Sequence, residues 1–255
     1  MSDELVLNVM KPTATEDTTL GSLTSEDKYF YNEEHGLPAI MHLFDGHIGK
    51  DVLEIGSGTG AIAEWLVQTG CQVTAVEPEP ILAKRVRERF TENSAITVIE
   101  SDSTFAFDKL TKENKKFDTV IYVSVLEHIS DDLREFESAK SVLTDGGKLL
   151  IFVPALPALY APIDADTGHV RRYTKSRFKE LSRDVGMTIV SLNYFETVGI
   201  IPYFIVYKLL RRRVITNSST GFYNNVILPA SLAIYRLTRG RLIGKNLVLI
   251  ARKAQ

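Results

Sequence analysis

The chain has 255 residues, of which 44% are hydrophobic and 24% charged, and its formal net charge is −2 at pH 7. This composition excludes a wholly disordered or fibrous chain, and the length allows one large core. A single cysteine excludes an intramolecular disulfide and permits a reducing, cytoplasmic setting. No secretory signal pattern is visible, and no apolar run approaches the roughly 20 residues that span a bilayer.

The small net charge hides a strong asymmetry along the chain. Residues 200–255 contain ten Lys or Arg and no Asp or Glu, whereas residues 1–199 contain 20 basic and 32 acidic residues. Such a split indicates an anionic partner for the basic part, or a solvated basic surface balanced by an acidic body. Both interpretations stay open at this stage.

The first predicted elements form a β-α-β unit. Residues 1–27 are polar with little periodicity and predict a flexible leader before a domain over 28–255. Within that domain, the apolar run at 52–55 predicts a buried strand, 61–68 a helix, and 71–76 a second strand. Glu77 ends this second strand, where an acid can accept hydrogen bonds from two ribose hydroxyls. The unit therefore predicts a nucleoside-binding site.

A glycine loop joins the first strand to the helix. Gly56, Gly58 and Gly60 alternate with Ser57 and Thr59, so the backbone can turn tightly and approach a ligand closely. The helix opens inside the loop and directs its first N–H groups at that ligand. A dinucleotide domain is disfavoured, because the last glycine of the usual G-x-G-x-x-G spacing is displaced.

The remaining elements follow in a regular order. A charged loop is expected at 111–116 and a glycine turn at 146–147. The other predicted helices and strands lie at 81–90 (helix), 95–100 (strand), 117–123 (strand), 131–143 (helix), 148–153 (strand), 176–185 (helix), 187–195 (strand) and 247–251 (strand).

Several of these segments resemble motifs of class I S-adenosylmethionine-dependent methyltransferases. They are the E-x-G-x-G-x-G pattern that begins at Glu54, the Asp102-Ser103 pair after the third strand, FDTVIYVSVLEHI at the fourth, and LTDGGKLLIFVP at the fifth. The motifs occur in family order over about residues 50–154. The resemblance implies an α/β Rossmann-like fold with a seven-stranded, mostly parallel sheet. Its last strand is antiparallel, between the fifth and sixth, and a helical insertion precedes it.

The resemblance also implies S-adenosyl-L-methionine as cofactor, S-adenosyl-L-homocysteine as product, and a set of binding residues. Glu77 would hold the ribose, Asp102 the adenine amino group, and the glycine loop the amino-acid portion. In such enzymes a helical segment, here 28–49, often covers the cofactor. The implied cofactor-binding residues are Glu54, Gly56, Ser57, Gly58, Glu77, Pro78, Asp102, Ser103, Ser124, Glu127, His128 and Tyr31.

The segment 154–175 is the candidate acceptor side. It resembles a D-x-x-x-x-H-x-R-R-Y-T stretch of a bacterial methyltransferase subgroup often encoded with surface-polysaccharide genes. The candidate catalytic residues are His169, Asp164 and Tyr173, and the candidate substrate-binding residues are Asp166, Arg171, Arg172 and His35. The alternative is a plain loop before a helix, with Thr174 as N-cap, Arg172 paired to an acid and His169 bonded within the turn.

The chemistry of methyl transfer limits what these residues must do. The sulfonium methyl is already activated, so the site must mainly align the nucleophile, the methyl carbon and the sulfur. A hydroxyl nucleophile also has to lose its proton, and histidine, here His169, suits that work. The five histidines show no paired ligand spacing, so no metal site is predicted.

The insertion at 199–240 combines two apolar segments with clustered arginines. It predicts helices that pack on the domain or on a second subunit, form a lid over a lipophilic acceptor, or lie at an anionic membrane surface. No nucleic-acid-binding module is recognised, and the predicted partner is a small, anionic or lipophilic acceptor. The chain is expected to be a monomer or homodimer in the cytoplasm, with membrane association left open.

The function predicted from these observations is O-methylation of a sugar, polyketide or related metabolite. The first alternative is methylation of a lipid-linked or isoprenoid acceptor under the 199–240 segment. A second alternative, from another class, is a non-catalytic subunit that binds S-adenosylmethionine for regulation.

Overall fold

The computed structural model describes residues 36–212 and 221–254. These residues belong to one compact unit of the chain, Tyr31–Gln255. The predicted leader at 1–27 and the candidate site residues Tyr31 and His35 lie outside the described residues. The predicted domain boundaries therefore stay predictions.

The described part of the chain is built on a seven-stranded sheet with the order β3-β2-β1-β4-β5-β7-β6. All neighbouring pairs are parallel except β5–β7 and β6–β7, which are antiparallel. The strands are β1 (Asp51–Ile55), β2 (Gln72–Glu77), β3 (Ile96–Glu100), β4 (Phe117–Val123), β5 (Leu143–Pro154), β6 (Met187–Phe195) and β7 (Asn246–Lys253). The predicted antiparallel last strand between the fifth and sixth is confirmed.

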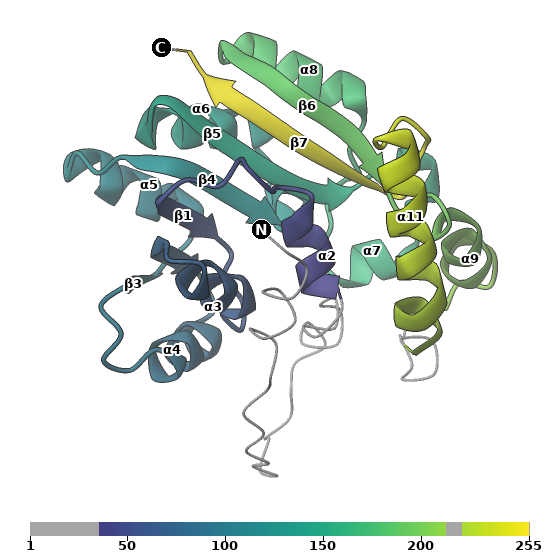
Figure 1. Cartoon of the computed structure of the whole chain (residues 1–255), viewed down its shortest axis with the longest axis horizontal. Helices are drawn as coiled ribbons and strands as arrows, with labels where there is room; N and C mark the ends of the chain where they lie inside the picture. Colours follow the sequence, from purple (N-terminus) through teal and green to yellow (C-terminus); the bar gives the residue numbers. More distant parts are fainter. Residues whose placement is uncertain (1–35, 213–220, 255) are drawn as a thin grey trace. The chain divides into compact units, whose positions relative to one another are not determined.

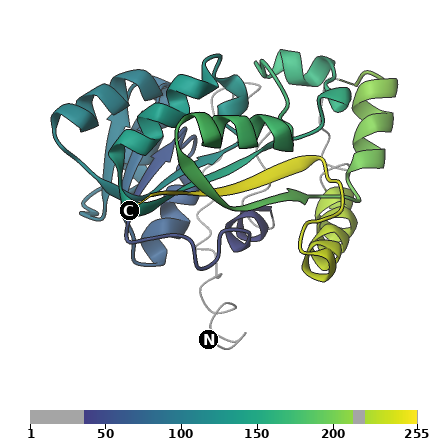
Figure 2. The ribbon, with the colours of Figure 1, turned by 90° about the horizontal axis from the view of Figure 1, so that it is seen from above.

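Helices cover both faces of this sheet, as Figures 1 and 2 show. One apolar core lies between the sheet and α5, α6 and α8. A second lies between the sheet and α2, α3, α4 and α11. These helices are α2 (Gly36–His42), α3 (Ala61–Gln68), α4 (Pro80–Arg89), α5 (Ser103–Lys112), α6 (Asp132–Val142), α8 (Lys175–Asp184) and α11 (Leu228–Thr238).

The central strand β5 shows why the sequence folds into these layers. Successive side chains of a strand point to opposite faces. Leu149 and Ile151 accordingly join one core, whereas Leu150 and Phe152 join the other. All four are fully buried. A strand that is apolar on both faces has to lie in the interior of a sheet, as β5 does.

The structure departs from the predicted elements at two places. Helix α5 extends to Lys112, so the expected charged loop at 111–116 is partly helical. The predicted turn at Gly146–Gly147 lies inside β5, which begins at Leu143. Gly146 has a φ of +77°, and the register between β4 and β5 shifts at this point. The glycines thus form an irregularity within the strand rather than a separate turn.

The segment after β6 contains the predicted helical insertion. It comprises α9 (Ile200–Tyr203), the π-helical segment η4 (Phe204–Leu209), a second π-helical segment η5 (Tyr223–Ile227), and α11. In the part of the chain that the structure describes, no helix is long and apolar enough to cross a membrane.

The strand order identifies where a ligand should bind. The connections run outward in opposite directions from β1 and β4, so these two neighbouring strands form the topological switch point of the sheet. Open α/β sheets bind ligands beyond the carboxyl ends of the strands at such a point. The glycine loop follows β1, and the short 3₁₀ helix η2 (Leu126–His128) follows β4.

Candidate active site

The glycine loop bends sharply after β1 and touches the turn after β4. The N–H groups of Gly56 and Ser57 both donate to the carbonyl of Val76, at 2.8 and 3.0 Å, which fixes the loop to the end of β2. Gly56 has a φ of +73°, and a Cβ added to it would lie 2.5 Å from Cγ2 of Val125. Only glycine fits this position without displacing the β4 turn.

Glu77 is fixed at the end of β2, at the edge of the same loop. Its Oε2 accepts a hydrogen bond from the N–H of Gly58 at 2.7 Å, and its Oε1 accepts one from the N–H of Glu79 at 3.0 Å. These bonds fix the carboxylate at the end of β2, where the family resemblance implies ribose binding. The geometry is compatible with the predicted ribose-binding role.

Buried polar atoms without a hydrogen-bond partner gather at this edge of the sheet. Among the described residues they include both carboxyl oxygens of Glu54, the hydroxyl of Ser57 and both carboxyl oxygens of Glu127. Burial, followed by the charge of Glu77, raises the pKa of Glu54 to about 8. Buried polar groups normally have partners, and unpaired ones at a ligand-binding edge suit a polar ligand.

The predicted adenine-side residues begin α5. The carboxyl of Asp102 accepts the N–H of Phe105 at 2.8 Å and is the N-cap of that helix, but the residue is otherwise exposed. The hydroxyl of Ser103 donates to Glu135 at 3.0 Å and therefore engages α6. Pro78 is exposed beyond β2. These positions keep their assigned roles as predictions.

The turn after β4 brings the acceptor-side segment to the cofactor side. Ser124 begins it with a φ of +55° and donates its N–H to Phe152 at 2.8 Å. The N–H of Val170 donates to the carbonyl of Glu127 at 2.8 Å, and the hydroxyl of Tyr173 donates to the carbonyl of Leu126 at 3.1 Å. The segment 154–175 is thus bonded directly to the β4 turn.

His169 lies in a network centred on Asp164, which is in α7 (Pro162–Asp166). Nδ1 of His169 is 3.0 Å from Oδ1 of Asp164, and Nε of Arg172 donates to the same oxygen at 2.9 Å. The other oxygen of Asp164 accepts the hydroxyl of Tyr203 at 2.9 Å and the N–H of Ala161 at 2.8 Å. Although burial opposes ionisation, the bonds from His169 and Arg172 leave the pKa of Asp164 below its usual value.

The far side of the histidine ring faces Glu127 and His128. Nε2 of His169 lies 3.9 Å from Oε1 of Glu127, and the rings of His128 and His169 meet edge to face with centroids 4.8 Å apart. Glu127 is fully buried, and this burial raises its pKa to about 8. Two histidines and a carboxyl group, predicted to serve different roles, therefore form one corner of the site.

The other predicted acceptor-side residues have structural contacts. Arg171 pairs with Asp132 at 2.7 Å and donates to the carbonyl of Ser130 at 2.5 Å. Tyr173 is buried and its ring stacks on Phe178, so its side chain packs the segment 154–175 against α8. Asp166 is exposed at the end of α7.

The contacts that the plain-loop alternative requires are also present. The hydroxyl of Thr174 accepts the N–H of Arg177 at 3.1 Å and caps α8, while Arg172 pairs with Asp164 and His169 is bonded within the turn. These contacts position the segment, and they do not exclude a role for the ring of His169. Tyr203 was missed by sequence reasoning, because no short-range pattern links it to Asp164, 39 positions away.

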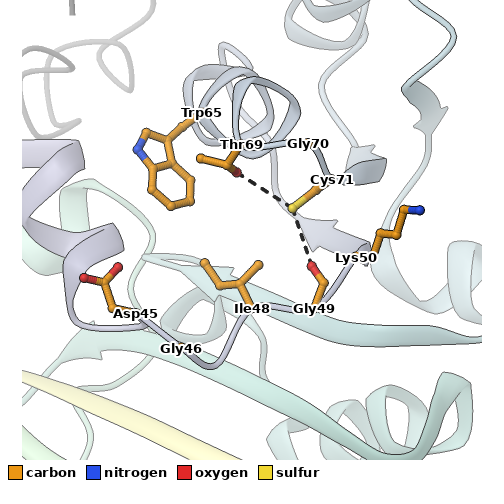
Figure 3. Close-up of a pocket in the computed structure, with 9 residues that line it drawn as sticks. All are labelled: Asp45, Gly46, Ile48, Gly49, Lys50, Trp65, Thr69, Gly70 and Cys71. Atoms are coloured by element: carbon orange, nitrogen blue, oxygen red, sulfur yellow. Dashed lines mark hydrogen bonds between the residues drawn. The ribbon is translucent and has the colours of Figure 1, made fainter. Parts of the chain in front are cut away.

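A shallow pocket lies at the opposite edge of the sheet, as Figure 3 shows. Gly49 and Lys50 directly precede β1, and Cys71 directly precedes β2, so this pocket faces the amino ends of the strands. The thiol of Cys71 donates to the carbonyl of Gly49 at 3.5 Å, and burial raises its pKa. This pocket contains none of the predicted site residues.

The sequence matches a family of methyltransferase domains over residues 33–192. This match covers more than half of the chain, and the chain therefore belongs to that family. It is also 30% identical over 118 residues to the ubiquinone biosynthesis O-methyltransferase of Actinobacillus pleuropneumoniae serotype 7 (strain AP76). That alignment covers 44% of this chain and 49% of that protein, so the chain spans about half the length of the curated relatives it matches.

Solved structures agree on the fold. An S-adenosylmethionine-dependent methyltransferase from Mesorhizobium loti has a TM-score of 0.58 at 18% identity, covering 85% of this chain and 96% of that one. Phosphoethanolamine N-methyltransferase 2 of Haemonchus contortus, solved with S-adenosyl-L-methionine, has a TM-score of 0.54 at 15% identity, covering 92% and 61%. With the family match, the chain is a methyltransferase domain that shares the fold of these enzymes.

Proposed function

We propose that this protein transfers the methyl group of S-adenosylmethionine to a hydroxyl oxygen of a small-molecule acceptor. The observation that carries the proposal is the position of His169, oriented by Asp164 and directed at the turn after β4. That turn touches the glycine loop at Val125, so the histidine lies next to the predicted cofactor site. A relative named as an O-methyltransferase supports oxygen as the methylated atom.

The Asp164–His169 arrangement suits an acceptor that must lose a proton. The carboxylate fixes one ring nitrogen and leaves the other directed into the site, as in other acid–histidine pairs that assist a hydroxyl nucleophile. An N-methyltransferase acting on a neutral amine has less need of such a pair. We therefore place the acceptor hydroxyl beside His169.

The test is a methyl-transfer assay with radiolabelled S-adenosylmethionine and a fractionated bacterial metabolite extract. We expect label in the water-soluble fraction, in a product that resists acid treatment as an ether does. A His169→Ala variant should lose about 10²- to 10⁴-fold in rate, while the control His42→Ala, at an exposed position, keeps the wild-type rate. Labelled methyl groups bonded only to nitrogen atoms of the products would contradict O-methylation.

A lipophilic acceptor under the 199–240 segment is the second candidate. The insertion is tied directly to the acceptor-side segment, through the Tyr203–Asp164 bond and a 2.5 Å bond from Lys208 to the carbonyl of Tyr160. The guanidinium of Arg172 also lies 4.5 Å from the centroid of the Tyr203 ring. The insertion exposes large apolar side chains, namely Ile201, Phe204, Ile205, Leu209, Leu210, Phe222, Val226 and Leu237.

The same assay separates the two candidates. A lipophilic acceptor would carry the label into the chloroform-soluble fraction. A Leu209→Asp, Leu210→Asp variant should then lose turnover on that fraction while it still binds S-adenosylhomocysteine. This second candidate includes peripheral contact of the insertion with anionic lipid. Such contact predicts that the protein sediments with phosphatidylglycerol vesicles at low salt, and less so at high salt.

A further inference from the structure

The corner that Glu127, His128 and His169 form has the composition of a metal site. One carboxyl oxygen and one ring nitrogen from each histidine all lie within 4.8 Å of one another. We call these three residues the Glu127–His169 cluster. Two of them are consecutive in η2, and the third comes from the acceptor-side segment. Spacing along the sequence could not have shown the cluster, because the fold brings His169 to the other two.

Glu127 is the strongest sign that a ligand belongs in this corner. Its side chain is 1% exposed, and neither carboxyl oxygen has a hydrogen-bond partner among the described residues. One of these oxygens faces Nε2 of His169 at 3.9 Å. A buried carboxyl group without a partner is costly, and a bound cation would supply the missing interaction.

The surroundings of His169 are those of a metal-binding histidine. A ring that binds a metal through one nitrogen usually donates its other N–H to a carboxylate, which fixes the tautomer and the ring orientation. Asp164 occupies that position at Nδ1, 3.0 Å away, and leaves Nε2 directed at Glu127. Asp164 is itself bonded to Arg172 and Tyr203, so the residue that orients His169 is also fixed in place.

His128 completes the set from the solvent side. It is exposed, and its ring meets that of His169 edge to face. Ligands of a tetrahedral zinc ion lie about 2.0–2.2 Å from the metal and so about 3.4 Å from one another. The ligand atoms here lie up to 4.8 Å apart, so binding requires the side chains to move closer together.

We propose that Glu127, His128 and His169 bind one divalent first-row transition-metal ion of the Zn²⁺ or Co²⁺ kind. Imidazole ligands favour such ions over Mg²⁺ or Ca²⁺, which take oxygen ligands. Three protein ligands leave at least one coordination position open, as in catalytic zinc sites with two histidines and a glutamate. The ion would lie beside the cofactor crevice, where the acceptor is placed.

The role of the ion rests on the proposed O-methyltransferase function. The acceptor hydroxyl would bind the ion through oxygen, which makes its proton easier to lose to water. The oxygen would then bond to the methyl carbon while the carbon–sulfur bond breaks. The electron pair of the broken bond stays on the sulfur, which gives S-adenosylhomocysteine. In the metal-bound enzyme His169 would hold the ion and the proton would pass to water, whereas without the ion His169 keeps the proton-accepting role proposed above.

The experiment is isothermal titration of the chelator-treated full chain with Zn²⁺ and with Co²⁺. We expect one equivalent to bind, and Co²⁺ to show the visible absorption of a low-coordinate site with nitrogen and oxygen ligands. Glu127→Gln, His128→Ala and His169→Ala should each weaken metal binding by about 100-fold or more. Substitution of a residue that only hydrogen-bonds to a metal ligand already costs roughly 10- to 100-fold in affinity. The control His42→Ala should bind like the wild type.

Folding and function are read separately in the same experiment. Glu127→Gln keeps the shape of the side chain and His128 is exposed, so both variants should fold and, without the ion, unfold thermally at temperatures close to that of the wild type. Wild-type protein that binds no ion at unit stoichiometry, or variants that bind it as tightly, would overturn the metal site. An ion that binds while methyl transfer is absent would leave the site standing and reject the O-methyltransferase function.

Discussion

At the scale of single residues, Glu54 is the most unusual group at the predicted cofactor site. Its carboxyl is buried at the end of β1 without a hydrogen-bond partner among the described residues, and it lies near the charge of Glu77. Burial first, and that charge second, raise its pKa from 4.5 to about 8. The folded protein therefore holds a proton on Glu54 at pH values where the unfolded chain has lost it.

This difference predicts a pH dependence of stability for the ligand-free protein. A raised carboxyl pKa stabilises the folded state fully below pH 4.5, and the contribution is lost as pH rises toward 8. We expect Glu54 alone to lower the free energy of unfolding with a slope of at most about 1.4 kcal/mol per pH unit in that window, and Glu127, whose pKa is also about 8, to add a similar slope. Urea unfolding at several pH values measures it. A Glu54→Gln variant should flatten the slope, and an unchanged slope would contradict the assignment.

At the scale of elements, the contact between the glycine loop and the β4 turn holds the two halves of the site together. A Cβ at Gly56 would lie 2.5 Å from Cγ2 of Val125, whereas a Cβ at Gly46 would meet nothing within 4 Å. The two glycines share nearly the same backbone conformation, with φ values of +73° and +72°. They therefore form a matched pair that separates backbone strain from steric clash.

We predict that Gly56→Ala is the more damaging of the two substitutions. Both should lose about 1–2 kcal/mol from the left-handed backbone, but Gly56→Ala should lose about 1–3 kcal/mol more from overpacking against Val125. Thermal unfolding measures the difference, and S-adenosylhomocysteine binding should weaken in Gly56→Ala alone. Adding Val125→Ala should restore part of the loss. Equal destabilisation of the two variants would show that the close contact has no energetic consequence.

Of the bonds that attach the insertion to the acceptor-side segment, the Tyr203–Asp164 bond can be removed by a conservative substitution. Tyr203→Phe deletes the hydroxyl that donates to Asp164. A hydrogen bond to a charged group is worth about 1.5–3 kcal/mol, so amides of α9 and η4 should exchange hydrogen faster by roughly tenfold or more. Amides of the buried strand β5 serve as the internal reference and should not change. Equal protection of α9 in both proteins would show that the bond does not hold the insertion.

At the scale of the whole molecule, the sequence predicted the sheet well because its signals are local. Apolar runs, the glycine loop and the LEH turn each occupy consecutive residues, and the family resemblance that they carry implied the antiparallel β7. The candidate site was harder, since its contacts join distant positions. The Tyr203–Asp164 bond and the approach of His169 to Glu127 depend on how α9 and the 154–175 segment pack. No periodicity along the chain encodes that packing.

The folded protein shows where some charged residues of the acidic part (1–199) and the basic part (200–255) lie. The acidic body supplies Glu54, Glu77, Glu127 and Asp164 to the crevice side. The basic part supplies Lys245, which is 3.4 Å from the buried Glu196, and Lys208, which binds the acceptor-side segment. Lys208 therefore helps to hold the insertion on the domain.

The central claim is that the glycine-loop crevice binds the methyl donor, and calorimetric titration with S-adenosylhomocysteine tests it most directly. The account predicts one binding site per chain. Glu77→Ala should weaken binding at least tenfold, because it removes the carboxylate predicted to accept the ribose hydroxyls. Glu88→Ala, an exposed change on α4, should leave the affinity unchanged. No binding at millimolar ligand, or equal affinity in Glu77→Ala and the wild type, would contradict the account.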